Sequence, residues 1–199
     1  MINFALPGMY EHYEVIIPLC SLFKIYPHFF YDNININAVF GNFQFCCWDG
    51  GRIFNNISYK HASIEDILRL KEIYNNILEI PMRLIFTTAL TEPDLCHSYY
   101  DNTVAHLCED EMNEIVVASP VLEEYLRINY PKYSFIASTT KCISSAEEAK
   151  EELERYKMCC IDYNLNKNTT FLNSLKSEEK DKVEFLVNAI CAPGCPTRK

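Results

Sequence analysis

The stretch "EIVVASPVLEEYLRINYPKYSFIASTTK", residues 114–141, contains the pattern that decides the fold. An apolar run at Glu114–Ala118 is followed by a segment of helical period, and a second apolar run follows at Ser134–Ala137. Pro120 stands directly after a serine, where a helix starts well, and Pro131 ends the same segment. A strand, a helix and another strand in this order predict a parallel sheet with helices packed outside it.

The same alternation runs along the rest of the chain. Ser63 and Asp66 resemble a capping box at the start of a helix, and Ser145 precedes a segment that is acidic at its start and basic at its end. Each expected strand is short and rich in Ile, Val, Phe, Tyr or Cys. The expected strands are Ile2–Leu6, Ala38–Cys47, Met82–Thr87, Glu114–Ala118, Ser134–Ala137, Met158–Tyr163 and Val183–Asn188.

Polar residues follow nearly every expected strand, and this favours a barrel over an open doubly wound sheet. In a barrel every strand end faces one mouth, whereas an open sheet concentrates polar function at one switch point. A complete eight-fold barrel needs about 250 residues, and this chain has 199. The expected fold is therefore an incomplete or distorted (β/α) TIM-type barrel, with about seven parallel strands in a single domain over residues 1–199. It lacks its last unit or is truncated at its C-terminus.

The net charge of the chain indicates which partners to expect, and its cysteine content bears on the compartment. The formal net charge is -9, and without a basic face the chain has no means to displace counterions from nucleic acid. A small-molecule or peptide ligand is expected, with no nucleic-acid or membrane partner. No signal peptide and no run of about 20 apolar residues is recognised. We expect a cytoplasmic protein whose ten cysteines are mostly reduced.

The motif "WDGGR", residues 48–52, is the strongest candidate for part of a ligand pocket. Its two glycines permit close approach to a ligand, and Arg52 offers a fork for a carboxylate or phosphate. Trp48 belongs to the same candidate, and Asn102 forms a polar pair with Asp101 near the expected mouth. The alternative is a tight turn in which Arg52 pairs with a nearby acid.

Lys141, Asp162 and His12 are the candidate catalytic residues, because each follows an expected strand. An apolar wall around Lys141 would lower its pKa enough for Schiff-base chemistry. His12 stands beside two glutamates and would act as a general base. The alternatives are a surface lysine for Lys141 and a solvated helix start for His12.

Several cysteines suggest metal ligands at first sight. Cys96, His97, His106 and Cys108 do not match the paired spacing of a zinc site. The cysteine pairs at 46–47 and 159–160 stand near strand ends, where each pair presents only one thiol to the interior. Small buried side chains are the simpler interpretation of both pairs.

Cys191 and Cys195 are the best candidates for metal ligands. They form a C-x3-C pair shaped by two prolines and a glycine close to the last residue. Reduced thiolates suit zinc or an iron-sulfur cluster, and two further ligands must then come from elsewhere, such as Cys142 or Cys160.

The segment "VEFLVNAICAPGC", residues 183–195, together with "STTK" after a strand and the strand-helix order, resembles the U32 peptidase-like family. The matched residues are Glu184, Ala189, Cys191, Gly194 and Cys195, while Asn188 stands near the position of the family's histidine. The resemblance implies a barrel-type fold. It also implies an activity related to collagenase-like peptidases, or to iron-sulfur proteins that act in hydroxylation of quinones and RNA.

These observations lead to one principal hypothesis and two alternatives. The principal hypothesis is a U32 peptidase-like barrel that binds a small or peptidic ligand at the mouth, with Arg52, Asn102, Asn188 and Trp48 around the ligand. An iron-sulfur cluster or zinc would sit at the terminal cysteines, and the activity would be that of a peptidase-like hydrolase or of an iron-sulfur-dependent enzyme. The alternatives are a non-catalytic binding module on the same scaffold and a Schiff-base lyase using Lys141.

Overall fold

The computed structural model describes residues 1–49, 62–88 and 97–187. Within these ranges strands and helices alternate along the chain, as the sequence predicts. The strands are β1 (Ile2–Pro7), β2 (Ile34–Gly41), β3 (Met82–Phe86), β4 (Glu114–Val117), β5 (Ser134–Ala137), β6 (Met158–Cys160) and β7 (Val183–Glu184). The α-helices are α1 (Tyr13–Ile25), α2 (Ile64–Lys71), α3 (Tyr99–Cys108), α4 (Pro120–Asn129), α5 (Ala146–Leu153), α6 (Thr169–Ser174) and α7 (Ser177–Lys180).

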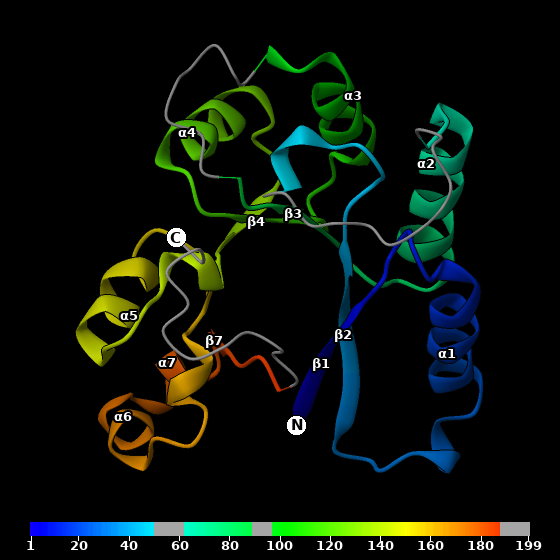
Figure 1. Ribbon diagram of the computed structural model, residues 1–199. Coiled ribbons are helices and arrows are strands. Elements are labelled where there is room, and N and C mark those ends of the chain that lie inside the picture. The colour runs from blue at the N-terminus through cyan, green and yellow to red at the C-terminus, as the bar shows by residue number, and fades with distance from the viewer. Residues whose placement is uncertain (50–61, 89–96, 188–199) are drawn as a thin grey trace.

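All seven described strands belong to one sheet, and each pairs in parallel with its neighbours in the chain. The sheet curls into a half-barrel with the helices outside the curve (Figure 1). Consecutive parallel strands joined by helices are the repeating unit of a (β/α) barrel. The expectation of an incomplete barrel with seven parallel strands is confirmed.

The two faces of the sheet carry two separate apolar clusters. Met82, Leu84 and Phe86 point toward the helices and belong to the main core. Their neighbours of opposite phase, such as Ile85 and Val116, belong to a smaller cluster on the concave face. Because both faces are covered, β3 and β4 are buried along their whole length, which explains their continuous apolar sequence.

The helix starts lie where the sequence predicts them. Ser63 and Ser145 each form a complete capping box, with Asp66 and Glu148 as the respective partners. Ser119 accepts a hydrogen bond from the backbone N–H of Leu122 at the start of α4. Each cap satisfies a backbone donor that the first helical turn leaves unpaired.

The boundaries of three strands differ from the expected ones by more than one residue. β2 covers residues 34–41 rather than 38–47, and the chain turns away at Asn42. β6 ends at Cys160, because Asp162 caps a short 3-10 helix, η6 (Tyr163–Leu165). β7 spans two residues, and residue 188 of its expected range lies outside the described residues.

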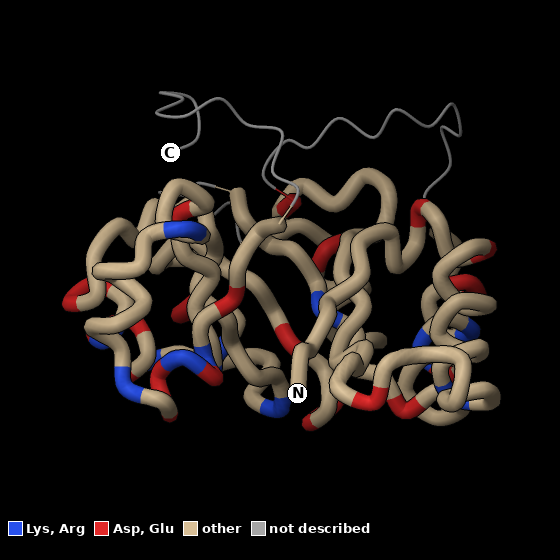
Figure 2. The backbone as a smooth tube through the Cα atoms, turned by 90° about the horizontal axis from the view of Figure 1, so that it is seen from below, with Lys and Arg blue, Asp and Glu red and all other residues tan. Residues whose placement is uncertain are grey.

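The described surface carries charges of both signs. Acidic and basic residues are both spread over the face in view in Figure 2. In the part of the chain that the structure describes, no helix has the length and apolar character needed to cross a bilayer.

Candidate functional site

A cavity of about 310 Å³, here called the mouth cavity, lies at the carboxyl ends of β1, β2 and β3. Glu11, His12, Asn42 and Asp49 contribute polar groups to its lining. They come from the turn after β1 and from the segment after β2. The carboxyl ends of the strands are where (β/α) barrels carry their active sites. The mouth cavity is thus the natural candidate site of this half-barrel.

The turn after β1 is shaped so that His12 packs directly against Gly8. Gly8 has a φ of +87°, which a glycine adopts without strain. A Cβ atom on Gly8 would lie 2.9 Å from both Cβ and Cδ2 of His12. The His12 N–H donates to the Gly8 carbonyl at 2.9 Å, while the imidazole makes no capping hydrogen bond to α1. The structure therefore places His12 at the mouth with its side chain outside the helix cap, and its role as a general base stays a prediction.

Asn42 and Asp49 also line the cavity, and of the two only Asp49 belongs to a motif that the sequence singles out, "WDGGR". Asn42 is buried, and its Nδ2 donates to the Ile85 carbonyl at 3.2 Å, which ties the end of β2 to β3. Asp49 is buried at the end of a 3-10 helix, η2 (Cys47–Asp49), and its carbonyl accepts from the Thr87 hydroxyl at 3.3 Å. The sequence indicates Asp49 as a site residue by its position, because it follows an apolar run and precedes the two glycines of "WDGGR".

A buried carboxylate fixes the position of η2. Asp101 is fully buried and accepts hydrogen bonds from the backbone N–H groups of Cys47 and Trp48, both at 3.2 Å, and from the Ser98 hydroxyl. The Trp48 ring is fully buried and meets Phe86 edge-on, with 5.1 Å between ring centroids. In this structure Trp48 contributes to the core rather than to the cavity lining, and Asp101 acts as an anchor for the segment that carries Asp49.

The cysteines at 46 and 47 lie in the turn after β2 and not on the strand. Cys46 is buried and Cys47 is exposed. Burial first, and then the charge of Asp101, raise the pKa of the Cys46 thiol well above its ordinary value. The same two causes raise the pKa of Cys47. Both raised pKa values favour the neutral thiol, which is a poorer nucleophile than the thiolate.

Asn102 lies in a hydrogen-bond network between α3 and α4. Its Oδ1 accepts from the hydroxyls of Tyr125 at 2.8 Å and Tyr130 at 2.6 Å, and its Nδ2 donates to the Ser98 carbonyl at 2.7 Å. Asn102 is not part of the mouth-cavity lining. These bonds occupy its amide in joining two helices.

Lys141 follows β5 as expected, in a 3-10 helix, η5 (Thr139–Lys141), but its amine turns toward α5. Nζ lies 3.1 Å from Glu152 Oε2 and 4.8 Å from the centroid of the Tyr156 ring. These two contacts hold the amine against α5 and Tyr156. The ion pair corresponds more closely to the alternative of a lysine near the surface, although its side chain is only 14% exposed.

Asp162 also follows its expected strand and acts there as a helix cap. Its Oδ1 accepts from the backbone N–H of Asn164 at 2.8 Å, and its own N–H donates to the Ile143 carbonyl at 3.0 Å. The mouth cavity therefore brings together His12, Asp49 of the "WDGGR" motif and Asn42, while Lys141 and Asp162 are absent from its lining. The remaining predicted site residues, Arg52, Asn188, Cys191 and Cys195, lie outside the described residues.

A buried ion-pair cluster crosses the concave face of the half-barrel. Arg83 on β3 is 1% exposed, and its Nε lies 2.7 Å from Glu114 Oε2 on β4. Its Nη1 bonds Glu184 on β7, and Lys157 completes the cluster at 2.7 Å from Glu114. The pKa of Arg83 is raised, because the charges of Glu184 and Glu114 outweigh the lowering effect of burial. In the sequence, the cluster is indicated by one charged residue in each of two apolar strands, Arg83 in β3 and Glu114 in β4.

The described cysteines do not assemble a metal site. Within residues 1–49, 62–88 and 97–187 there is no group of three or more His, Cys, Asp or Glu side chains placed to hold a metal. Burial raises the pKa of Cys160 well above its ordinary value, and the charge of Glu184 adds to this effect. Burial thus favours the neutral thiol at Cys160. The Cys142 Sγ faces the Thr140 carbonyl at 3.5 Å.

Comparison with known proteins yields one weak structural likeness. No protein-family model matches the sequence, and no curated protein matches it. Among solved structures, that of a U32 peptidase aligns with a TM-score of 0.45 and 14% sequence identity. The alignment covers 75% of this chain and 58% of the other, so the chain spans less than two thirds of that peptidase. This similarity concerns the fold, and it assigns no role to any residue.

Proposed function

We propose that the chain binds a small or peptidic ligand in the mouth cavity. The observation that carries the proposal is the cavity of about 310 Å³ at the carboxyl ends of β1, β2 and β3, with His12 in its lining. Its size lies within the range of about 300–1,000 Å³ that is usual for small-molecule sites. The two carboxyl groups that line it, of Glu11 and Asp49, favour a ligand that presents an amino group.

A peptide with a free amino terminus fits this lining. Its ammonium group would pair with Glu11 or Asp49, and its amide groups would meet the side chains of His12 and Asn42. His12 is placed to exchange a proton with the bound ligand, because its side chain is exposed at the cavity and is not used as a helix cap.

The test is a titration of the full chain with unblocked tetra-alanine, in which NMR measures the chemical shifts of the backbone amides. We expect the largest changes at residues 8–12 and 41–42, and we expect His12→Asn to weaken binding several-fold. His106→Asn is the matched control, because His106 is an exposed histidine on α3 that does not line the cavity. Equal binding by the two variants, or the same affinity for N-acetylated tetra-alanine, would contradict the proposal.

Two versions of this function differ in whether a reaction follows binding. A hydrolase of the U32 peptidase-like type would cleave a bound peptide, whereas a binding module would release it unchanged. The structural contacts of Lys141 with Glu152 and of Asp162 with Asn164 favour the binding module, because these two candidate catalytic groups are engaged elsewhere. Release of new amino groups from tetra-alanine, measured with an amine-reactive dye, distinguishes the two versions.

An iron-sulfur cluster or zinc at Cys191 and Cys195 is the second part of the proposal. Its support is the C-x3-C spacing and the resemblance of the surrounding segment to the U32 peptidase-like family. Anaerobic purification followed by iron, sulfide and zinc analysis tests it. A metal-free protein whose stability is unchanged by Cys191→Ser would contradict this part while leaving the mouth cavity unaffected.

A further inference from the structure

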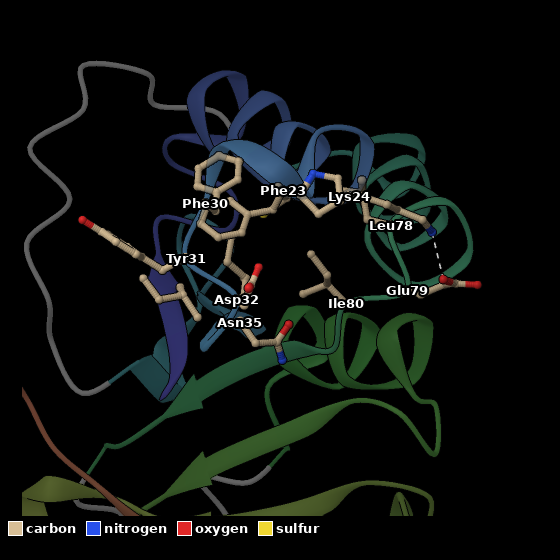
Figure 3. Close-up of a pocket in the computed structure, with 13 residues that line it drawn as sticks. Phe23, Lys24, Phe30, Tyr31, Asp32, Asn35, Leu78, Glu79 and Ile80 are labelled. Atoms are coloured by element: carbon tan, nitrogen blue, oxygen red, sulfur yellow. Dashed lines mark hydrogen bonds and ion pairs between the residues drawn. The ribbon is translucent and has the colours of Figure 1, made fainter. Parts of the chain in front are cut away.

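A second and larger cavity, of about 440 Å³, lies near the amino end of β2, and we call it the amino-end cavity. It is enclosed by the last turns of α1, by the loop that contains the short 3-10 helix η1 (Pro27–Phe29), by the start of β2 and by the residues after the π-helix η3 (Glu72–Ile77) (Figure 3). It shares no lining residue with the mouth cavity. The proposed function does not use it.

The walls of the amino-end cavity combine aromatic and aliphatic side chains with polar groups. Phe23 and Phe30 stack with 3.7 Å between ring centroids and an interplanar angle of 19°. Ile36, Leu78 and Ile80 are buried and line the same cavity. A cavity of this size that has both apolar walls and polar groups can hold a small molecule.

The single basic side chain of the lining, Lys24, is already engaged. Its Nζ donates to Glu79 Oε2 and to the Ile77 carbonyl, each at 2.8 Å. Lys24 and Glu79 therefore neutralise each other at the rim of the cavity (Figure 3). Because these two charges cancel, the carboxylate of Asp32 determines the net charge of the cavity.

The remaining polar groups of the cavity are hydrogen-bond acceptors. The Asp32 carboxylate stands between Phe30 and Asn35 (Figure 3), and among the described residues no side-chain hydrogen bond or ion pair engages it. Asn35 donates its Nδ2 to Asn3 Oδ1 at 3.2 Å, which leaves its own Oδ1 available on the cavity side. Tyr31 directs its hydroxyl away from the cavity.

We propose that the amino-end cavity binds a small organic cation with an aromatic or aliphatic body, of the arylalkylammonium class. The ammonium group pairs with Asp32 and donates to Asn35, and the apolar body lies against Phe23 and Phe30. A carboxylate beside aromatic rings recognises cations in two ways, through the ion pair and through the faces of the rings. An anion of the same size is excluded, because Lys24 is bound to Glu79 and offers it no free positive charge.

The test is isothermal titration of the full chain with 2-phenylethylammonium, 2-phenylethanol and phenylacetate, which share a body and differ in charge. We expect 2-phenylethylammonium to bind at least about tenfold more tightly than the other two, as a charge-assisted hydrogen bond requires. Asp32→Asn should reduce that affinity at least about tenfold. Asp181→Asn removes the same charge from an exposed helix end and should change the affinity less than about twofold.

Two further variants assign the binding to this cavity. Phe30→Leu keeps an apolar side chain of similar size. It should weaken the binding of 2-phenylethylammonium about threefold or more, because the stacked ring is lost. His12→Asn, at the mouth cavity, should leave its affinity unchanged. Absence of binding at millimolar 2-phenylethylammonium overturns the proposal. Equal affinity of wild type and Asp32→Asn, or equal binding of phenylacetate, also overturns it.

Discussion

The two cavities at opposite ends of β2 differ in what surrounds them. The mouth cavity takes carboxylate, amide and imidazole groups from segments that directly follow strands. The amino-end cavity takes stacked aromatic rings from the end of a helix and from the loop before β2. In a parallel sheet the chain reaches each strand from the preceding helix and continues after it to the next helix. The two ends of one strand therefore lie beside different segments of the chain. The difference teaches that this half-barrel can form two cavities with different linings at the two ends of one strand.

The ion-pair cluster around Arg83 lies on the concave face between β3 and β7, and removing it should have the largest effect on stability. Arg83→Met leaves Glu114 buried with Lys157 as its remaining partner. We expect the free energy of unfolding to fall by about 3–5 kcal/mol, because a buried carboxylate loses its compensating charge. Urea denaturation followed by circular dichroism measures it.

The control for Arg83 is Arg69→Met, since Arg69 is half-exposed and lies 3.5 Å from Asp66. We expect its effect to stay below about 1 kcal/mol. Restoring part of the lost stability by adding Glu114→Gln to Arg83→Met would confirm that the cost comes from the unpaired charge. A loss of under about 1 kcal/mol in Arg83→Met itself would show that the cluster does not stabilise the fold.

Two aspartates test the contrast between the ends directly. Asp101→Asn should lower the free energy of unfolding by about 2–3 kcal/mol, because two buried backbone N–H groups lose a charged acceptor. Asp32→Asn at the amino-end cavity should lower it by less than about 0.5 kcal/mol, since no described partner is lost. Trp48, the single tryptophan of the chain, reports the Asp101 effect by its fluorescence. Equal losses in the two variants would remove the distinction between an anchoring and a ligand-binding carboxylate.

A smaller effect is expected from the glycine that adjoins His12. Gly8→Ala should cost about 1–2 kcal/mol, because alanine is strained at a φ of +87° and its Cβ would meet His12 at 2.9 Å. Gly41→Ala is the matched control, with its closest contacts at 3.2 and 3.3 Å to Met9. Thermal unfolding compares the two variants, and we expect the larger loss of stability in Gly8→Ala. A variant Gly8→Ala as stable as Gly41→Ala would contradict the proposed packing of His12.

The smallest effect concerns pH and the amino-end cavity. Burial raises the pKa of Cys20 from 9.0 to about 11. Because the unfolded chain releases this proton first, stability is full below pH 9 and is lost as the pH rises toward 11, at no more than about 1.4 kcal/mol per pH unit. Cys20→Ala should make the decline between pH 9 and 11 less steep in denaturation curves. An unchanged slope would show that the thiol is accessible to water.

The order of strands and helices was predictable because it depends on local signals. Ser63, Ser119 and Ser145 mark helix starts by their own hydrogen bonds, and the apolar runs between them are covered on both faces. The end of β2 was not predictable in the same way. Apolar residues continue past Gly41, and the turn depends on the bond from Asn42 to the Ile85 carbonyl, a residue 43 positions away.

The candidate site was predictable in its location and only in part in its residues. His12 reaches the mouth because the turn after β1 is local. Lys141 does not, because Glu152 and Tyr156 attract its amine, and neither contact is visible in the sequence around residue 141. Trp48 was assigned to the pocket from its motif, whereas its indole is covered by side chains from β3 and α4.

The bond between Arg83 and Glu184 also has a consequence for the order of folding. Each strand pairs with the next one in the chain, so the sheet can grow by one strand-helix unit at a time, with a modest loop to close at each step. Arg83 and Glu184 are 101 residues apart and meet only after β7 has joined the sheet. In a sheet that grows in chain order from β1, the buried guanidinium gains its second carboxylate in the last step.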